Sequence, residues 1–135
     1  MANLPIEISI WKIYVDDTNV LWPHGEIELN NFFKHLNNCF EDIKFTMEEE
    51  DNGSISFLDI LVTRKKNGTI GHEVFGKKTH TERYLHADSH HHPAQKIGAL
   101  NTLAIRASRI SDEEHINEEN NHLTNVFKTI GYNPK

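Results

Sequence analysis

Cysteine is nearly absent from this chain of 135 residues, which contains only Cys39. One thiol cannot form an intramolecular disulfide framework, and it lacks the partners of a cysteine-based zinc site. The chain also lacks an apolar run long enough to span a bilayer, and its start lacks the charged and then apolar pattern of a secretory signal. We therefore predict an intracellular protein, nuclear or cytoplasmic, that does not associate with a membrane.

Positive charge is scarce overall, because 14 Lys and Arg stand against 20 Asp and Glu, for a net charge of −6. This balance argues at first against a nucleic-acid partner, since phosphate binding is built largely from Lys and Arg. The cations are concentrated, however, between residues 64 and 109, where nine Lys and Arg accompany three Asp and Glu. This basic middle third is the part of the chain suited to phosphate.

A β-hairpin is predicted near the start of the chain. Residues 8–15 and 18–22 are rich in β-branched and aromatic side chains, and Asp16-Asp17 lies between them at a position that suits a turn. An amphipathic helix follows, which ends near Asn37-Asn38. Its apolar face is formed by Leu29, Phe32, Phe33, Leu36 and Phe40.

Three further strands are predicted at residues 43–49, 55–63 and 69–75. Turn signals separate them at Asp51-Asn52-Gly53 and Lys66-Asn67-Gly68. The pattern predicts a three-stranded antiparallel meander, which we expect to share a sheet with the hairpin under the cover of the helix.

Two helices are predicted in the last third of the chain. The first has its apolar face at Ile97, Leu100, Ala104, Ala107 and Ile110. Ser111 and Glu114 match the Ser-x-x-Glu capping box that begins the second helix, and Gly131 ends it. The buried stripe of that helix is Ile116, Leu123, Val126, Phe127 and Ile130. The predicted fold class is thus α+β, an antiparallel sheet with a covering helix followed by a helical hairpin.

The paired aspartates Asp16 and Asp17 suggest chemistry as well as a turn. Joining a nucleoside triphosphate to a primer hydroxyl uses two divalent ions, which hard carboxylate oxygens hold. A tight hairpin between rigid strands would present adjacent carboxylates for this purpose. The simpler interpretation is a polar turn, because Asp is common in turns for local hydrogen-bonding reasons.

The hairpin and the segments after it carry a resemblance to a known family. Trp11-Lys12-Ile13-Tyr14-Val15-Asp16-Asp17-Thr18 resembles the catalytic hairpin of the reverse transcriptases of retroelements. Later segments resemble, in the family's order, the palm of the Penelope-like group. These segments are residues 32–37, 43–48, 57–62, 78–85 and 89–93, with Lys96.

The resemblance implies part of an RNA-directed DNA polymerase. Residues 1–86 would be the C-terminal part of the palm, and residues 87–135 a thumb-like helical segment. Asp16 and Asp17 would be the catalytic metal ligands, and Tyr14 and Val15 would lie beneath the primer terminus. The implied partners are an RNA template, a DNA primer and deoxynucleoside triphosphates, and the implied cofactor of the complete parent enzyme is Mg²⁺ or Mn²⁺.

The chain departs from that family in ways that put activity in doubt. No counterpart is found for the fingers or for the metal-binding aspartate of an earlier palm strand, Gly76 replaces a basic residue and Lys78 replaces a proline. No GIY-YIG nuclease follows. We therefore expect a fragment that is inactive alone and that self-associates through the exposed edge of the palm.

An alternative function is a non-catalytic module that binds nucleic acid or a protein partner through the basic middle third. The candidate phosphate ligands are Lys77, Lys78, Arg83, Lys96, Arg106 and Arg109. Arg106 and Arg109 are expected side by side on the outer face of their helix, about 60° apart at ~100° per residue. Each could equally be an ordinary solvated charge.

A cluster of histidines suggests a third hypothesis, a metal-binding protein. His86, His90, His91 and His92 lie near His80 and Asp88. Three adjacent histidines cannot all reach one ion from a regular backbone, and supporting cysteines are absent. A solvated or helix-capping role is the simpler interpretation of this tract.

Overall fold

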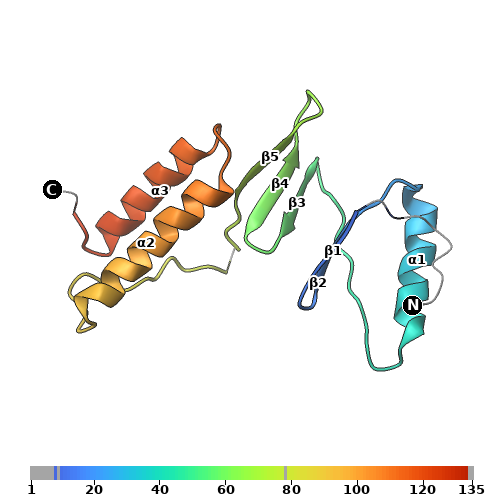
Figure 1. Cartoon of the computed structure of the whole chain (residues 1–135), viewed down its shortest axis with the longest axis horizontal. Coiled ribbons are helices and arrows are strands. Elements are labelled where there is room, and N and C mark those ends of the chain that lie inside the picture. The colour runs from blue at the N-terminus through green and yellow to red at the C-terminus, as the bar shows by residue number, and fades with distance from the viewer. Residues whose placement is uncertain (1–7, 9, 78, 134–135) are drawn as a thin grey trace. The chain divides into compact units, whose positions relative to one another are not determined.

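The computed structural model describes residues 8, 10–77 and 79–133, which form two compact units. The N-terminal unit, Met1–Glu50, contains β1 (Ile10–Tyr14), β2 (Asp17–Leu21) and α1 (Gly25–Cys39). The C-terminal unit, Asp51–Lys135, contains β3 (Ser54–Phe57), β4 (Ile60–Arg64), β5 (Ile70–Val74), α2 (Pro93–Ile110) and α3 (Ile116–Thr129), as Figure 1 shows. The described residues are thus α+β, with two small antiparallel sheets and three helices. The predicted boundary between residues 86 and 87 falls inside the second unit and stays a prediction.

The first hairpin forms where the sequence predicts it, but its turn lies one residue earlier. Tyr14 pairs with Asp17, so Val15 and Asp16 are the two turn residues and Asp17 is the first residue of β2. Val15 has a φ of 54°, a left-handed value that a β-branched residue rarely adopts. A positive φ at the first central residue matches the twist of antiparallel strands, which explains why a two-residue turn tolerates this strain.

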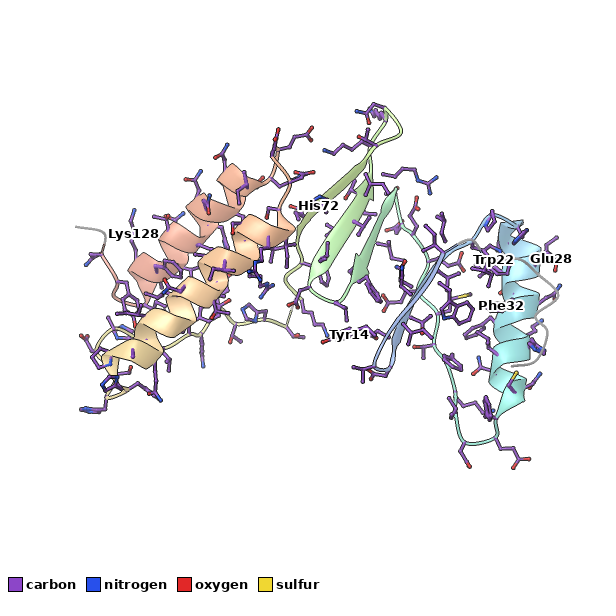
Figure 2. The ribbon with its side chains drawn as sticks, viewed as in Figure 1. Tyr14, Trp22, Glu28, Phe32, His72 and Lys128 are labelled. Atoms are coloured by element: carbon purple, nitrogen blue, oxygen red, sulfur yellow. The ribbon has the colours of Figure 1, made fainter. Side chains whose placement is uncertain are left out.

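The core of the N-terminal unit is an aromatic cluster around Phe32, whose side chain is 7% exposed. The ring of Trp11, from β1, meets the Phe32 ring edge-on at a centroid distance of 5.6 Å. The ring of Trp22, just after β2, lies 5.1 Å from Phe32, and both are labelled in Figure 2. Trp22 Nε1 also donates to the carbonyl oxygen of Gly25 at 2.9 Å, which fixes the entry to α1. The apolar stripe of α1 therefore holds the hairpin through one buried ring.

The predicted strand over residues 43–49 is wrong, because this segment has no regular structure. Asn37 supplies the reason. Its side-chain oxygen accepts the backbone N–H of Phe45 at 2.7 Å, and its amide nitrogen donates to the Phe45 carbonyl at 3.3 Å. A side chain of α1 thus satisfies the backbone groups that a strand partner would otherwise bind.

The meander of the C-terminal unit has the order β3-β4-β5, with each pair antiparallel. The predicted Asn52-Gly53 turn is confirmed, with φ values of 50° and 81°. The single predicted strand over residues 55–63 is instead two strands, because Phe57 pairs with Ile60 around a tight turn at Leu58-Asp59. Asp59 is a common turn residue, but Leu58 is not, and its φ of 56° is a left-handed value that such a side chain rarely adopts.

The two helices of the C-terminal unit form an antiparallel pair. The N–H of Ala87 donates to the carbonyl of Ile130 near the end of α3, and Lys96 near the start of α2 donates to the carbonyl of Ala87. The predicted stripe of α3 is confirmed at Leu123, Val126 and Ile130, which are buried together with Ala107 of α2.

The predicted inner face of α2 is rotated from the observed one. Ile97 is 56% exposed and Ala104 is also exposed, whereas Leu103 and Arg106 are half-buried. The predicted and the observed buried faces of α2 follow the same helical period. Periodicity alone therefore could not show which of two neighbouring rows of small and apolar residues is buried.

The turn that leads into α3 is held by Asp112 and not by the predicted Ser111, and α3 itself begins after His115 without a side-chain cap. The Ser111 hydroxyl is buried with no hydrogen-bond partner, and the Ser111 N–H donates to Ala107 at the end of α2. The Asp112 carboxylate instead accepts the N–H groups of Glu114 at 3.2 Å and His115 at 3.1 Å. Ser111 and Asp112 are both good capping residues, and the end of α2 at Ile110 decides between them.

Asp112 also joins the helical pair to the meander. Its carboxylate accepts from Lys65 Nζ at 3.1 Å and from the backbone N–H of His72 at 3.2 Å, and its own N–H donates to the carbonyl of His72 at 2.9 Å. The hydrogen bond from His115 holds the pKa of Asp112 well below its usual range, and Asp112 in turn raises the pKa of His115. Hydrogen bonds to the carboxylates of Glu114 and Asp112 raise the pKa of Lys65.

Replacing Phe32 with alanine is expected to unfold the N-terminal unit selectively. Truncating a buried aromatic residue costs about 3 kcal/mol or more, which is large for a unit with so small a core. Both tryptophans of the chain, Trp11 and Trp22, contact Phe32. In a urea titration of this variant, tryptophan fluorescence should therefore show no cooperative unfolding transition. The far-ultraviolet circular dichroism of α2 and α3 should still show one. Ile27→Ala on the same helix, at a position 78% exposed, should leave both signals unchanged.

The stability of the C-terminal unit should depend on pH through Asp112 and His115. The pKa of His115 is raised in the folded state, so protonated His115 stabilises the fold. This stabilisation is complete below the unfolded-state pKa of about 6.5, and it is lost as pH rises through the folded-state pKa. The pKa of Asp112 is lowered in the folded state, so ionised Asp112 stabilises the fold. This stabilisation is present above the unfolded-state pKa of about 3.9, and it is lost as pH falls from there through the folded-state pKa. Thermal denaturation followed by circular dichroism should give a higher melting temperature at pH 5.5 than at pH 8. Other groups near this pair are Lys65, Glu114 and Glu73.

His115→Gln should flatten that pH dependence, since glutamine does not titrate. His35→Gln, on α1, is the matched control and should keep the wild-type profile. An unchanged difference in melting temperature between the two pH values in the His115 variant would contradict the assignment.

Candidate nucleic-acid interface

Helix α3 presents a polar face without carboxylates. At ~100° per residue, five exposed side chains fall within a sector about 100° wide, opposite the buried Leu123, Val126 and Ile130. These side chains are Asn117, Asn121, Thr124, Asn125 and Lys128. We call them the amide face of α3. Asparagine can pair with adenine through two hydrogen bonds in the major groove, and lysine can bind phosphate or guanine.

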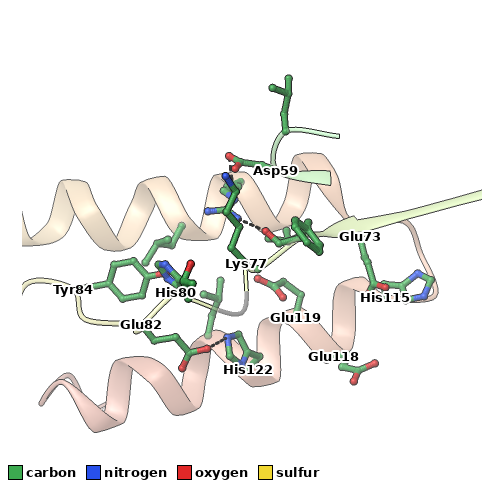
Figure 3. A pocket seen from close by; sticks show the side chains of 18 residues that line it. Asp59, Glu73, Lys77, His80, Glu82, Tyr84, His115, Glu118, Glu119 and His122 are labelled. Carbon is green, nitrogen blue, oxygen red and sulfur yellow. Dashed lines mark hydrogen bonds and ion pairs between the residues drawn. The ribbon is translucent and has the colours of Figure 1, made fainter. Parts of the chain in front are cut away.

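The acidic residues of α3 begin at the edge of this face, since Glu118 lies about 20° from Asn125 and Glu119 about 120° from it, at ~100° per residue. Glu118, Glu119 and His122 line a cavity of about 590 Å³ in the C-terminal unit, as Figure 3 shows. His122 Nε2 lies 3.1 Å from a carboxylate oxygen of Glu82 across this cavity. Asp59 and Glu73 from the meander add two more carboxylates to the lining. Its five carboxylates outnumber its two cations, Lys77 and Arg106, so the cavity is unsuited to phosphate.

Two of the predicted phosphate ligands have partners within the fold. Arg106 lies 3.8 Å from the Asp59 carboxylate and donates to the carbonyl of Phe75 at 3.4 Å, so it ties α2 to the meander. Lys96 donates to the carbonyl of Ala87 at 2.6 Å. Both side chains are half-buried, whereas the sequence predicts Arg106 on the outer face beside Arg109.

Of the remaining predicted phosphate ligands that the structure describes, Lys77 lines the same cavity as Arg106. Arg83 and Lys77 are exposed on the segment between β5 and α2. Arg109 is exposed on the last turn of α2. Lys78 lies outside the described residues. None of these observations tests the predicted role in binding, which stays a prediction.

The tip of the proposed catalytic hairpin is exposed. Tyr14 is 60% and Val15 85% exposed, and Asp16 and Asp17 are exposed at the turn between β1 and β2. Across the residues that the structure describes, no group of three or more His, Cys, Asp or Glu side chains could hold a metal ion. Two adjacent carboxylates alone do not make the ligand set of a two-metal site, so no metal-dependent step is derived from them. The predicted Mg²⁺ or Mn²⁺ cofactor stays untested.

The histidine tract has local structural roles in the described part of the chain. His92 accepts the N–H of Ala94 at 3.2 Å and caps α2 ahead of Pro93, which confirms the capping interpretation for this residue. His86 Nδ1 accepts the N–H of Asp88, and His80 shares a hydrogen bond with the Tyr84 hydroxyl at 2.8 Å.

Sequence reasoning missed the amide face. The predicted stripe of α3 defines the opposite side of the helix, so the residues could have been listed from the same periodicity. Asparagine and threonine carry no net charge, however, and a search based on Lys and Arg passes over them.

Comparison with known proteins gives one finding. Residues 83–135, less than half of the chain, match the family model of an animal helix-turn-helix domain. No curated protein and no solved structure matches. The matched segment contains α2 and α3 and, with them, the amide face.

This match corrects the resemblance drawn from the sequence. The segment interpreted as the end of the palm and the start of a Penelope-like thumb matches a helix-turn-helix family, and not a reverse transcriptase. The identification as a reverse transcriptase is therefore wrong. Separately, the described helices include none long and apolar enough to cross a membrane.

Arg106→Gln is expected to loosen the C-terminal unit. Losing a charge-assisted contact to Asp59 and to the Phe75 carbonyl should lower its free energy of unfolding by about 1–2 kcal/mol. Urea denaturation followed by circular dichroism measures the change. Arg109→Gln, three residues later on the exposed side, should change the stability by less than about 0.5 kcal/mol. Equal effects of the two substitutions would contradict the assigned role of Arg106.

Proposed function

We propose that the C-terminal helical pair binds double-stranded DNA through the amide face of α3. The observation that carries this proposal is the coincidence of two features in one segment. Residues 83–135 match an animal helix-turn-helix domain, and the amide face of α3 within it consists of three amides, a hydroxyl and a lysine, with the Glu118 carboxylate at its edge. In helix-turn-helix proteins the second helix lies in the major groove and contacts base edges.

The distribution of charge indicates which part of α3 would approach the duplex. Glu113 and Glu114 are exposed just before the helix, and Glu118 lies in its first turn. These carboxylates would be repelled by phosphates near the N-terminal end. The later part of the amide face, Asn121 to Lys128, has no carboxylate and ends in a cation. We infer that this part makes the base contacts.

The affinity is expected to come from few phosphate contacts. Residues 83–135 contain six Lys and Arg and six Asp and Glu, and two of those cations, Lys96 and Arg106, already have partners within the fold. Of the other four, Arg83, Arg109 and Lys128 are exposed, and Lys135 lies outside the described residues. Because the salt dependence of binding scales with the number of neutralised phosphates, a slope of about −3 or shallower is expected on a log–log plot.

Binding of the full chain to a pool of fluorescent duplexes tests the proposal. At about 50 mM salt, fluorescence anisotropy should show saturable binding to duplex DNA that weakens as salt is raised. Lys128→Gln should make the salt slope shallower by about 1. Asn121→Ala should reduce the affinity for selected sequences about tenfold, corresponding to ~1.4 kcal/mol of a base contact.

The matched control is Asn120→Ala, which removes the same side chain from the same helix. Asn120 is exposed but lies about 40° outside the amide face, at ~100° per residue. Its replacement should leave the affinity unchanged. The proposal would be contradicted if the chain did not bind duplex DNA at low salt, or if Asn120→Ala and Asn121→Ala lowered the affinity equally.

A further inference from the structure

The dipeptide Asn-Gly occurs twice in the C-terminal unit, each time in a turn. Asn52-Gly53 lies just before β3, and Asn67-Gly68 lies between β4 and β5. The backbone nitrogen after an asparagine can attack the asparagine side-chain carbon, and glycine obstructs this attack least because it has no side chain. Both asparagines are exposed. Sequence and exposure therefore do not distinguish the two sites, whereas their hydrogen bonds do.

The side chain of Asn67 is folded toward the peptide with which it would react. Its oxygen, Oδ1, accepts the backbone N–H of Thr69 at 3.0 Å and the Thr69 hydroxyl at 2.7 Å. A side-chain oxygen that binds the N–H two residues later lies across the intervening peptide, which here is that of Gly68. The carbonyl carbon Cγ of Asn67 is thereby directed toward the Gly68 nitrogen.

The surroundings of Asn67 also favour the reaction itself. When the Gly68 nitrogen attacks Cγ, negative charge develops on Oδ1, and the two Thr69 donors already bind that atom, as an oxyanion hole does. A Cβ atom built on Gly68 meets no described atom within 4 Å, so the attacking nitrogen is accessible. Lys66 is an exposed cation directly before Asn67, and its charge favours loss of the Gly68 N–H proton.

Asn52 has a different environment. Its amide nitrogen donates to the Asp51 carboxylate at 2.9 Å, and no donor to its side-chain oxygen occurs among the residues that the structure describes. Gly53 is half-buried, and a Cβ atom built on it lies 3.5 Å from the Arg64 carbonyl oxygen. The neighbouring Asp51 carboxylate disfavours loss of the Gly53 N–H proton. The same dipeptide is therefore much less activated here.

We infer that Asn67 is a site of spontaneous conversion to aspartate and isoaspartate, and that its turn protects Asn52 from the same reaction. A bond forms between the Gly68 nitrogen and Asn67 Cγ. The bond from Cγ to the amide nitrogen breaks, and the Gly68 proton leaves with that nitrogen in ammonia. The product is a cyclic imide.

Water then opens the imide, with its hydroxyl going to a carbonyl carbon and its proton to the Gly68 nitrogen. Breaking the bond between Cγ and that nitrogen gives aspartate. Breaking the bond between the Asn67 backbone carbonyl carbon and that nitrogen gives isoaspartate, in which the main chain runs through the former side chain. No oxidant, reductant or enzyme is required.

The conversion changes the turn beside the contact that joins the meander to the helical pair. Either product adds a negative charge, and isoaspartate lengthens the main chain between β4 and β5 by a methylene. Lys65 begins this turn, and its Nζ binds Asp112 at 3.1 Å. The Lys65 carbonyl accepts the N–H of Gly68 at 3.0 Å, and this hydrogen bond has to open before the attack. The modification is therefore slow, accumulates as the protein ages and does not depend on DNA binding.

Peptide mapping by mass spectrometry tests the inference on the full chain, incubated at mildly alkaline pH without DNA. Asn67 should convert about tenfold faster than Asn52 in the same sample, less than the ~100-fold gained from an oxyanion-hole donor in an enclosed site. In ¹⁸O-labelled water the converted peptide should gain an ¹⁸O atom at residue 67. A methyltransferase specific for isoaspartyl carboxyl groups should label the same peptide.

Unfolding separates the effect of the structure from that of the sequence. In concentrated urea both turns are lost, and only the neighbouring charges still differ. The preference for Asn67 over Asn52 should then fall to about threefold or less, because exposed charges in water interact weakly.

The hydroxyl of Thr69 supplies a matched pair of variants. Thr69→Val keeps the branched shape and the backbone N–H but removes the hydroxyl donor. It should slow the conversion of Asn67 about fivefold, the equivalent of ~1 kcal/mol for one hydrogen bond. Thr69→Ser keeps the donor and should convert at the wild-type rate. Neither substitution should change the rate at Asn52, and circular dichroism should show that both variants are folded.

Four outcomes would overturn the inference. The first is a folded chain in which Asn67 does not convert, and the second is one in which Asn52 converts as fast as Asn67. The third is a preference that is unchanged in urea, which would assign it to the sequence alone. The fourth is a Thr69→Val variant that converts as fast as wild type, which would exclude the hydroxyl from the reaction.

Discussion

The C-terminal unit depends most on the contacts of one carboxylate, Asp112. This side chain holds the turn between α2 and α3, binds Lys65 beside the meander and accepts the backbone N–H of His72 in β5. The helical pair that matches a helix-turn-helix domain is therefore not held together by its own small core alone. The meander before residue 83 supplies partners for the turn between its helices, so the physical unit that positions α3 begins well before the matched segment. Arg106 reinforces the same junction from the middle of α2, through Asp59 and the Phe75 carbonyl.

The contact between the helical pair and the meander also determines which faces of α3 are buried and which are exposed. Because α3 is buried along Leu123 and Val126 and lines the cavity with Glu119 and His122, its remaining side carries amides, a hydroxyl and Lys128 after Glu118 in the first turn. A chain with a net charge of −6 can thus present a local surface compatible with a polyanion. The acidic N-terminal unit, organised around Phe32, is a separate body whose exposed hairpin carries the paired aspartates.

The sequence predicted the elements better than it predicted their details or the family. Strong local signals succeeded: Asn52-Gly53 forms its turn, and the stripe of α3 is buried. Weak or ambiguous signals failed. Leu58-Asp59 turns without a glycine, and Asn37 replaces a strand partner for Phe45. The Tyr-Val-Asp-Asp hairpin formed with its turn one residue early, but a short motif in the right local context was not sufficient evidence for a polymerase. The link from Asp112 to the meander and the inward position of Arg106 depend on contacts with residues 31 or more positions away, which local patterns do not encode.

The central claim is that the amide face of α3 contacts duplex DNA, and nuclear magnetic resonance of the ¹⁵N-labelled full chain tests it most directly. Titration with a bound duplex should shift the side-chain amide signals of Asn117, Asn121 and Asn125, together with backbone signals near Lys128. Signals of Asn30 and Asn37 on α1 should stay in place. Shifts confined to the N-terminal unit, or to the cavity lined by Glu82 and His122, would contradict the claim.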